Sequence, residues 1–304
     1  MDDVFIAGAG PAGLNAALTL GRARRRVLLA DAGPGRNATS GAVHNFLSRD
    51  GITPAELRQA GLDQLAAYPS VRIVQGQAVR ADGPRDDFTV RLADGSTHRA
   101  RRLLLATGVR DELPPVAGLA ERWGRGVLHC PYCHGFERRE LPLAVLENGG
   151  WGVHLAVHLR RFSDDVVLCT NGGPPPAAAQ QALLSERGIT VRPEPIERLH
   201  GAGGELERIT FAGGAGLKRR ALFVHPHTRQ HSDLPAQLGC RMLEDGAVEV
   251  DELGQSSVTG VWAAGDMARR PSMPLSGSQA VIAAADGLLA AVIIDQDLLY
   301  AAHP

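Results

Sequence analysis

The chain has 304 residues, of which 44% are hydrophobic and 21% charged, an ordinary composition for a folded protein of two domains. Its 32 Lys and Arg residues nearly balance 33 Asp and Glu residues, and the net charge of -1 gives no reason to expect nucleic acid or an anionic membrane as a partner. No apolar run reaches the length of a membrane span, and no basic leader or cleavage signal follows Met1. We therefore expect a cytoplasmic protein, in which paired cysteines do redox or metal work.

The chain opens on a strand, a glycine-rich turn and a helix. The predicted elements are a buried strand at residues 4–8, a helix at residues 12–20 and a second strand at residues 27–31. Gly8 permits a tight turn, Gly10 lets the backbone approach a pyrophosphate, and Gly13 allows close helix–strand packing. Asp31 ends the second strand, where the partner of a ribose hydroxyl is expected. The sequence therefore predicts a dinucleotide cradle at the start of the chain.

Further elements predict two α/β units. The first unit continues with a helix at 53–68, strands at 71–76, 88–92, 97–101 and 102–106, and, late in the chain, residues 258–266 and an apolar helix at about 279–299. The second has strands at 141–147, 165–170 and 221–224, helices at 152–162 and 176–187, and β structure over 196–217. We predict an α/β protein with two Rossmann-like, three-layer ββα dinucleotide-binding domains, the second inserted in the first. The first domain is assigned to residues 1–113 and 241–304, and the second to residues 114–240.

The middle of the chain carries a CPYC motif at residues 130–133, followed by His134. Two cysteines separated by two residues can close and reopen a disulfide, and a thiolate at the start of a helix is stabilised by the helix dipole. Because a dinucleotide cradle precedes this motif, we expect Cys130 and Cys133 to exchange electrons with a bound flavin. Cys169 and Cys240 stand alone, and we expect both to be buried as small hydrophobic residues.

Other interpretations of these residues are weaker. The run CPYCH matches the attachment motif of c-type haem, but attachment requires export to an oxidising compartment. A zinc site needs two further ligands, and the chain has no second CxxC, so no metal site is predicted. His225, His227 and His231 form a histidine-rich loop that we take to be solvated, although one of them could line a substrate cleft. A non-catalytic FAD-binding protein would leave the CPYC pair idle.

Four motifs occur in a recognisable order: the glycine turn at 8–13, Ala-Thr-Gly at 106–108, the CPYC motif, and Ala-Gly-Asp at 264–266. Together they resemble the low-molecular-weight thioredoxin reductases over nearly the whole chain. The resemblance implies a homodimer, FAD in the split first domain, and a mobile second domain in which Cys133 faces the flavin and Cys130 exchanges with substrate. The FAD-binding residues that it implies are Gly8, Gly10, Pro11, Ala12, Gly13, Asp31, Ala32, Arg36, Asn37, Asn45, Ala106, Thr107, Gly108, Gly265, Asp266, Gln279 and Ala280.

The second domain departs from the family pattern. A nicotinamide-binding relative would show GxGxxA after the strand at 141–147, but here Glu147 takes the place of the first glycine. Its carboxylate would lie where a phosphate approaches a helix N-terminus. Starting the motif at Gly150-x-Gly152 instead does not restore it, because Leu155 then occupies the position of the small third residue. Residues 170–173, after the next strand, supply neither an acid for a ribose hydroxyl nor an arginine for a 2′-phosphate. NADPH binding is therefore doubtful.

CPYCHG combined with an eroded nicotinamide site resembles the dithiol oxidases of the gliotoxin and holomycin type. We predict an FAD-dependent thiol–disulfide oxidoreductase that closes a disulfide in a small-molecule dithiol and reduces O2 to H2O2. His134 replaces the aspartate of ordinary thioredoxin reductases and is the predicted catalytic base, with His129 and His44 as weaker candidates. The alternative is a thioredoxin reductase-like enzyme that passes electrons from NADPH, or from a protein donor such as ferredoxin, through FAD to a protein disulfide such as that of thioredoxin.

Overall fold

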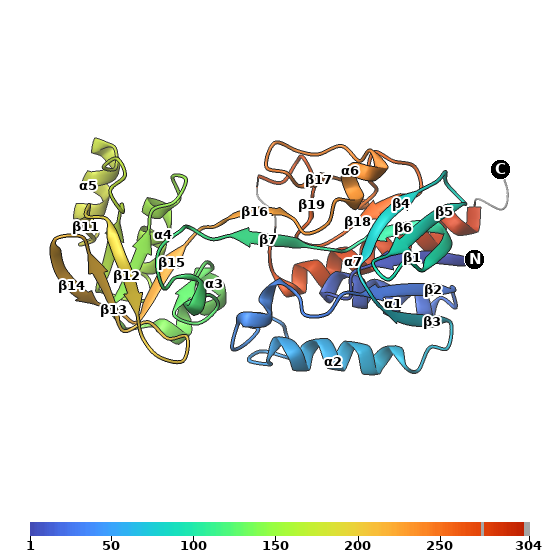
Figure 1. The fold of residues 1–304 in the computed structure, drawn as a ribbon, viewed down its shortest axis with the longest axis horizontal. Coiled ribbons are helices and arrows are strands. Elements are labelled where there is room, and N and C mark those ends of the chain that lie inside the picture. Colours follow the sequence, from blue (N-terminus) through green and yellow to red (C-terminus); the bar gives the residue numbers. More distant parts are fainter. Residues whose placement is uncertain (275–276, 301–304) are drawn as a thin grey trace. The chain divides into compact units, whose positions relative to one another are not determined.

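The computed structural model describes residues 1–274 and 277–300, and the chain divides into two compact units. Unit 1 comprises residues 1–38, 46–110 and 228–304, and unit 2 comprises residues 39–45 and 111–227. Figure 1 shows unit 1 with the blue and red ends of the chain and unit 2 with its green to yellow middle. The central part of the sequence therefore forms its own unit.

Three segments lie in a different unit from the one expected from the sequence. Residues 228–240, expected in the second domain, belong to unit 1, because the short helix α6 (Leu234–Leu238) packs on a strand of that unit. The Gln237 side chain donates to the carbonyl of Val79 at 3.0 Å, which fixes α6 there. Residues 39–45 and 111–113, expected in the first domain, belong to unit 2. None of these segments has the hydrophobic period from which its packing partner could be predicted.

Unit 1 is built on a sheet with the strand order β3-β2-β1-β6-β5-β4, and a seventh strand, β18, also pairs with β6. The strands are β1 Asp2–Ala7, β2 Val27–Asp31, β3 Val71–Gln75, β4 Ala78–Asp82, β5 Phe88–Leu92, β6 Thr97–Leu105 and β18 Val261–Ala263. β3, β2, β1, β6 and β18 are parallel, whereas β4 and β5 are antiparallel. Ala7 pairs with Leu105, so the chain leaves β1 and β6 at the same edge of the sheet.

β6 is one strand where the sequence predicts two, at 97–101 and 102–106. Its first half pairs antiparallel with β5, and its second half pairs parallel with β18. The polar residues of the first half are partly exposed, and the apolar residues of the second half are buried. The change in burial along the strand therefore explains why the pattern suggested a break.

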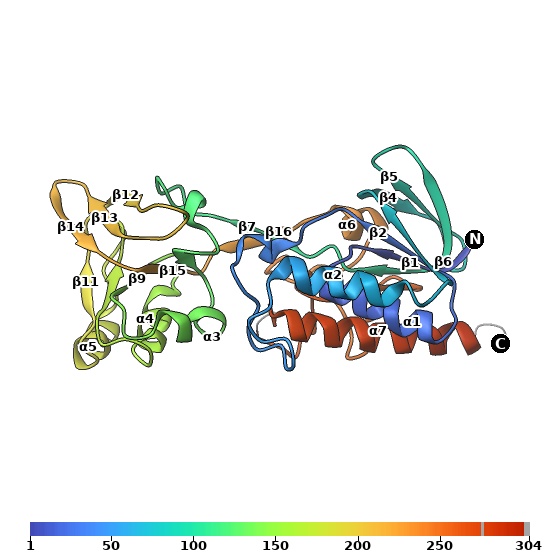
Figure 2. The same ribbon diagram turned by 90° about the horizontal axis from the view of Figure 1, so that it is seen from below.

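The helices of unit 1 besides α6 are α1 Pro11–Arg22, α2 Pro54–Leu65 and α7 Ala280–Tyr300. Figure 2 shows α1, α2 and α7 together on one side of the sheet. Thr53 and Glu56 form a capping box at the start of α2, each side chain accepting from the other's backbone N–H. α7 crosses close to α1 at Gly287, where an added Cβ would lie 2.0 Å from the carbonyl oxygen of Ala12.

Alternating side chains of the central strand β1 divide the core of unit 1 into two layers. Val4 and Ile6 join the cluster formed with α1 and α7, and Phe5 and Ala7 join the cluster on the opposite face. This is the period of two expected of a strand buried on both faces. The sheet is therefore covered on both sides, as the predicted three-layer fold requires.

Unit 2 repeats this plan on a smaller scale. Its parallel sheet has the order β11-β10-β9-β15-β8, and a three-stranded antiparallel sheet has the order β12-β13-β14. Figure 2 shows α3, α4 and α5 on one side of the parallel sheet and β12, β13 and β14 on the other. The elements are β8 Val127–Leu128, α3 Pro131–His134, β9 Leu143–Leu146, α4 Gly152–Leu159, β10 Val166–Cys169, α5 Ala178–Glu186, β11 Thr190–Arg192, β12 Ile196–His200, β13 Arg208–Phe211, β14 Gly214–Lys218 and β15 Ala221–Val224.

Short elements complete the fold, and the sequence analysis predicts none of them. The chain crosses between the units within the paired strands β7 and β16, and also on either side of residues 39–45. The remaining elements are β7 Val109–Glu112, β16 His227–Gln230, β17 Val248–Glu249, β19 Ala268–Arg269 and the 3₁₀-helices η1 Arg36–Thr39, η2 Ala120–Arg122 and η3 Phe136–Arg138. Within residues 1–274 and 277–300, no helix combines the length and the apolar character needed to cross a bilayer.

Candidate functional site

The CPYC motif lies in unit 2, where it follows β8 and forms the start of the one-turn helix α3. Cys130 precedes the first turn of α3 with an extended backbone, at φ -114° and ψ 111°. Pro131 suits the first turn because its ring fixes a helical φ and its missing N–H leaves no donor unpaired. The turn brings the Cα atoms of Cys130 and Cys133 to 5.2 Å from each other, and the disulfide between them is closed.

The backbone of the motif is arranged to stabilise a thiolate on Cys130. The N–H of Cys133 donates to the Cys130 sulfur at 3.1 Å, a hydrogen bond that strengthens when that sulfur is charged. Both cysteines are half-buried, so a thiol can reach them. Gly135 closes the turn, because an added Cβ would lie 2.5 Å from the carbonyl oxygen of Pro131. The geometry is that of an exchangeable rather than a sequestered disulfide.

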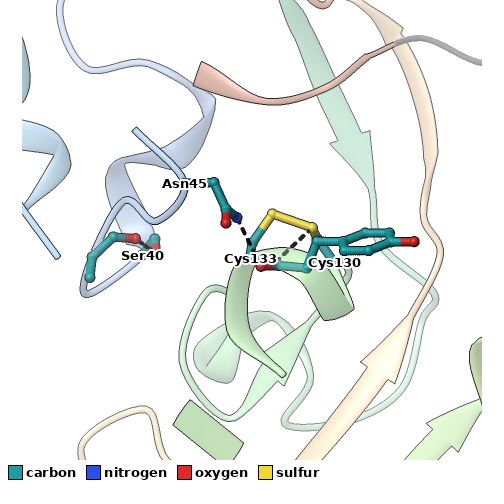
Figure 3. The surroundings of a disulfide bond; sticks show 6 residues. Ser40, Asn45, Cys130 and Cys133 are labelled. Carbon is teal, nitrogen blue, oxygen red and sulfur yellow. Dashed lines mark hydrogen bonds between the residues drawn. A yellow bond between two sulfur atoms is a disulfide. The ribbon is translucent and has the colours of Figure 1, made fainter. Parts of the chain in front are cut away.

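Asn45 holds this turn from the segment at 39–45. Its side-chain nitrogen donates to the carbonyl oxygen of Tyr132 at 2.9 Å, and Figure 3 shows the amide directed at the turn that carries the disulfide. Asn45 itself has a left-handed backbone, with φ 62°, which asparagine tolerates better than most residues. Sequence analysis assigned Asn45 to the FAD site, and that role stays a prediction. Its contact with the CPYC motif was not predicted.

His134 is the last residue of α3 and is half-buried. Burial, and after it the nearby charge of His44, lowers the pKa of its imidazole to about 4. The rings of His134 and His44 meet edge to face, with centroids 6.4 Å apart, and Nε2 of His44 lies 3.6 Å from a carboxylate oxygen of Glu137. His134 is therefore neutral at pH 7, which permits proton transfer but makes it a weak base.

Several rings surround the motif. His129, a weaker candidate base, stacks on Trp123 with ring centroids 5.7 Å apart. The ring of Tyr132 is 65% exposed and packs edge-on against His158, with centroids 4.6 Å apart. Phe136 is 63% exposed, and the guanidinium of Arg139 lies over its ring at 4.2 Å. The disulfide is thus flanked by exposed aromatic side chains that sequence analysis did not single out.

The glycine turn in unit 1 has the shape of a dinucleotide cradle. A Cβ added to Gly8 would lie 2.4 Å from the carbonyl oxygen of Ala106, and one added to Gly13 would lie 1.8 Å from the carbonyl oxygen of Gly8. A Cβ on Gly10 would meet no atom within 4 Å. Gly8 and Gly13 are therefore required by the fold, whereas the space beside Gly10 is open for a ligand that the backbone approaches closely. This arrangement fits the FAD that the sequence predicts.

Other predicted FAD residues gather at the same edge of the sheet. An added Cβ on Gly265, which has φ 77°, would lie 3.2 Å from Cβ of Ala12, so the motif at 264–266 lies beside the start of α1. Nη1 of Arg36 is 2.9 Å from a carboxylate oxygen of Asp266. The hydroxyl of Thr107 lies 3.4 Å from the sulfur of Met267. The remaining members are the turn residue Pro11, Gly108 at φ 69°, the exposed Ala32 and Asn37, and the half-buried Gln279 and Ala280 at the start of α7.

Asp31 ends β2 with its side chain almost wholly buried. Its carboxylate accepts from the N–H of Gly33 at 2.9 Å, from the side chain of Gln75 at 3.2 Å and from the guanidinium of Arg58. A ribose hydroxyl would share this carboxylate with Arg58, a partner that the sequence did not reveal because it lies on α2. The role of Asp31 as a ribose partner stays a prediction.

The corresponding turn in unit 2 is occupied by its own side chain. The carboxylate of Glu147 accepts from the N–H of Gly150 at 2.7 Å and from the N–H of Gly152 at 3.0 Å. Gly152 begins α4, so one of these is a donor that a pyrophosphate would use at this helix N-terminus. Beside it, the ring of Trp151 stacks on His225 with centroids 4.6 Å apart. His225, which sequence analysis placed in a solvated histidine-rich loop, is thus half-buried and packed on Trp151.

The profile of the pyridine nucleotide-disulphide oxidoreductase family matches residues 2–287. The chain belongs to this family.

Comparisons with individual relatives and solved structures agree with this family assignment. The thioredoxin reductase tcpT of Claviceps purpurea is 34% identical over 275 residues, which cover 87% of this chain and 86% of that protein. Among solved structures, HlmI superposes with a TM-score of 0.88 and 40% identity, covering 98% of this chain and 92% of that one. The oxidoreductase from Agrobacterium tumefaciens superposes with a TM-score of 0.91 and 36% identity, covering 98% and 99%.

The comparisons confirm the predicted resemblance to thioredoxin reductases and the α/β fold with Rossmann-like domains. The chain is an FAD-dependent, thioredoxin reductase-like enzyme. Cys169 and Cys240 are buried, as expected, and burial raises the pKa of the Cys169 thiol to about 12. Cys130 and Cys133 therefore stay the predicted redox pair.

Proposed function

We propose that this enzyme is a cytoplasmic dithiol oxidase, in which electrons enter from a small-molecule dithiol at the CPYC pair and leave to O2, giving H2O2. The observation that carries the proposal is the position of the Glu147 carboxylate, which already accepts from the N–H groups of Gly150 and Gly152. A dinucleotide phosphate would have to displace a like charge and replace two charge-assisted hydrogen bonds. Nicotinamide dinucleotides are therefore disfavoured as electron donors.

The end of β10 supports the same conclusion. Asn171, which follows Thr170, uses its side-chain oxygen to accept from the N–H of Ile196 at 2.7 Å. Thr170 is buried. An NADPH site needs an acid for the ribose hydroxyl or an arginine for the 2′-phosphate near this point, and residues 170–173 offer neither.

The cysteine pair performs the exchange. A substrate thiolate attacks the disulfide at Cys130, Cys133 leaves as a thiolate, and the second substrate thiol then displaces Cys130 to close the substrate disulfide. The N–H of Cys133 stabilises charge on the Cys130 sulfur when it leaves in turn. Bound in the cradle of unit 1, FAD would supply a two-electron acceptor between the reduced cysteine pair and O2.

A thioredoxin reductase-like activity is the second candidate. It is favoured by the relative from Claviceps purpurea, which is named a thioredoxin reductase, and by the exposed rings of Tyr132 and Phe136, which would suit a protein disulfide as partner. In this case electrons would come from NADPH or from a protein donor such as ferredoxin, and thioredoxin would accept them.

Oxygen consumption with a panel of small dithiols, without pyridine nucleotide, separates the two functions. A dithiol oxidase consumes O2 and forms H2O2 with at least one dithiol, and Cys130→Ser abolishes this turnover while leaving the flavin bound. Oxygen uptake that requires NADPH, or that survives Cys130→Ser, would contradict the proposal.

The family resemblance implies a homodimer, and α7 offers a surface for it. Val281, Leu288, Val292 and Leu299 are exposed and recur at intervals of seven and four residues, which places them on one face of the helix. We propose that a second copy of the chain covers this face.

A further inference from the structure

We propose that His44 is the residue on which the proton of the attacking thiol comes to rest, and that Glu137 is a positioning residue that stabilises the resulting imidazolium. The inference rests on the proposed function only in requiring that thiols exchange at the CPYC disulfide. Both side chains belong to unit 2, and both lie next to His134.

The need for a second proton acceptor follows from the burial of His134. A free thiol has a pKa of about 8.5, and it must lose its proton before it can attack. Burial and neighbouring positive charge hold the pKa of His134 at about 4, so its imidazole cannot retain that proton at neutral pH. His134 can still take a proton at one ring nitrogen while it gives one up at the other.

His44 is placed to receive that proton. Its ring meets the ring of His134 edge to face at a centroid separation of 6.4 Å, a gap that one water or a small rotation of a ring spans. Its Nε2 lies 3.6 Å from a carboxylate oxygen of Glu137, so the carboxylate faces the ring that would receive the proton. The other charge near His134, the guanidinium of Arg138, is paired with Glu205 at 2.9 Å.

The proton step balances. The substrate S–H gives its proton to His134, which passes its own N–H proton to His44, and the charge of the imidazolium is matched by Glu137. The thiolate then attacks one sulfur of the disulfide, a new S–S bond forms, and the other cysteine leaves as a thiolate. His44 is held in place by its neighbour Asn45, which donates to the Tyr132 carbonyl within the motif.

The test compares His44→Gln, Glu137→Gln and the double variant, with Glu186→Gln, an exposed acid at the end of α5, as the matched control. The first readout is the pH profile of disulfide reduction by dithiothreitol under argon. Glu137→Gln should slow the plateau about tenfold, and His44→Gln should abolish the acid limb and slow the plateau about 100-fold. Adding Glu137→Gln to His44→Gln should change little, because Glu137 acts through His44.

The second readout does not depend on oxidase activity. The protein is reduced with a phosphine, and the rate at which iodoacetamide alkylates Cys130 is followed against pH by mass spectrometry. The imidazolium should stabilise the thiolate, so His44→Gln and Glu137→Gln should each move the alkylation midpoint to higher pH, without adding to each other.

An unchanged acid limb and midpoint in His44→Gln, or effects of the two variants that multiply, would overturn the role of His44. Failure of dithiothreitol to reduce the wild-type disulfide would instead overturn the proposed function, and the alkylation midpoints would still decide the role of His44.

Discussion

His134 makes stability depend on pH because it is buried in the neutral form. Its pKa in the folded protein, about 4, lies below its value of 6.5 in the unfolded chain, so the unfolded chain binds more protons between these values. Its cost to stability is absent above about pH 7 and grows as the pH falls toward 4. We predict a loss of about 1–2 kcal/mol between about pH 7 and pH 5, measured by urea unfolding, that His134→Gln removes. An equal loss in both proteins would contradict this reading.

Glu147 is predicted to control dinucleotide affinity. Replacing it with glycine restores the family motif, removes a like charge and releases the N–H groups of Gly150 and Gly152. Because charge-assisted hydrogen bonds contribute about 1.5–3 kcal/mol each, Glu147→Gly should bind NADPH at least about tenfold more tightly than the wild type. Isothermal titration calorimetry measures this, with Glu186→Gln as a control that should bind as the wild type does. Equal affinities for wild type and Glu147→Gly would show that another feature excludes NADPH.

Individual residues differ in how far the sequence reveals their role. The conflict at Glu147 was visible from the motif, because the residue stands where a glycine is expected and lies within five residues of the N–H donors that its carboxylate binds. The partnership of His44 with Glu137 was not, because it joins segments far apart in the chain whose packing follows no hydrophobic period. Arg58 at Asp31 escaped prediction for the same reason.

The turn between β1 and α1 allows packing and ligand binding to be separated. Gly13→Ala would drive a Cβ to within 1.8 Å of the Gly8 carbonyl oxygen, whereas Gly10→Ala meets nothing within 4 Å. We predict that Gly13→Ala destabilises the protein by about 1–3 kcal/mol or more. Gly10→Ala should leave the thermal unfolding of the apoprotein unchanged and lower the fraction that retains FAD. Normal flavin content in Gly10→Ala would argue against this turn as the cradle.

α7 is tied to the sheet through a buried arginine. Arg102 is fully buried in β6, and its guanidinium bonds Asp297 of α7 and, at 2.7 Å, Asp86. Asp297→Asn leaves that charge with one carboxylate, and we predict a loss of about 2–3 kcal/mol in thermal or urea unfolding. Asp82→Asn, which removes the partner of Arg80 in an exposed pair, should cost less than about 0.5 kcal/mol. Equal effects would remove the anchoring role of Arg102.

Among the elements, long periodic segments were predicted well. α1, β2 and α7 lie close to their predicted ranges because their apolar runs are bounded by turn residues. The exposed strand β4, the connecting strands β7 and β16, and the short helix α6 were missed, since they are short or polar and form through pairing with distant residues. The local sequence pattern therefore identified the elements that form the core and missed the short elements that depend on contacts with distant residues.

At the scale of the whole molecule, dimerisation through α7 is testable by sedimentation velocity. Leu288→Glu places a charge in the exposed apolar face of the helix and should convert dimers to monomers. Val79→Glu, which alters a comparably exposed apolar residue on β4, should leave the dimer intact. A wild type that sediments as a monomer, or a Leu288→Glu dimer, would contradict the proposal.

The order of the motifs indicated one α/β unit inserted in another, but the domain limits needed tertiary contacts. The chain re-enters unit 1 at residue 228 because α6 packs on β4. Residues 39–45 belong to unit 2 because of contacts such as the hydrogen bond from Asn45 to Tyr132. The assignment of FAD to unit 1 and of a degenerate nicotinamide site to unit 2 stays a proposal, supported by the open space at Gly10 and the filled turn at Glu147.

The most direct measurement is the absorbance of the bound flavin under argon, after one equivalent of dithiothreitol or of NADPH is added. The account predicts rapid bleaching by the dithiol, loss of that bleaching in Cys130→Ser, and recovery of the oxidised spectrum with formation of H2O2 when air is admitted. Rapid bleaching by NADPH, with no response to the dithiol, would contradict it.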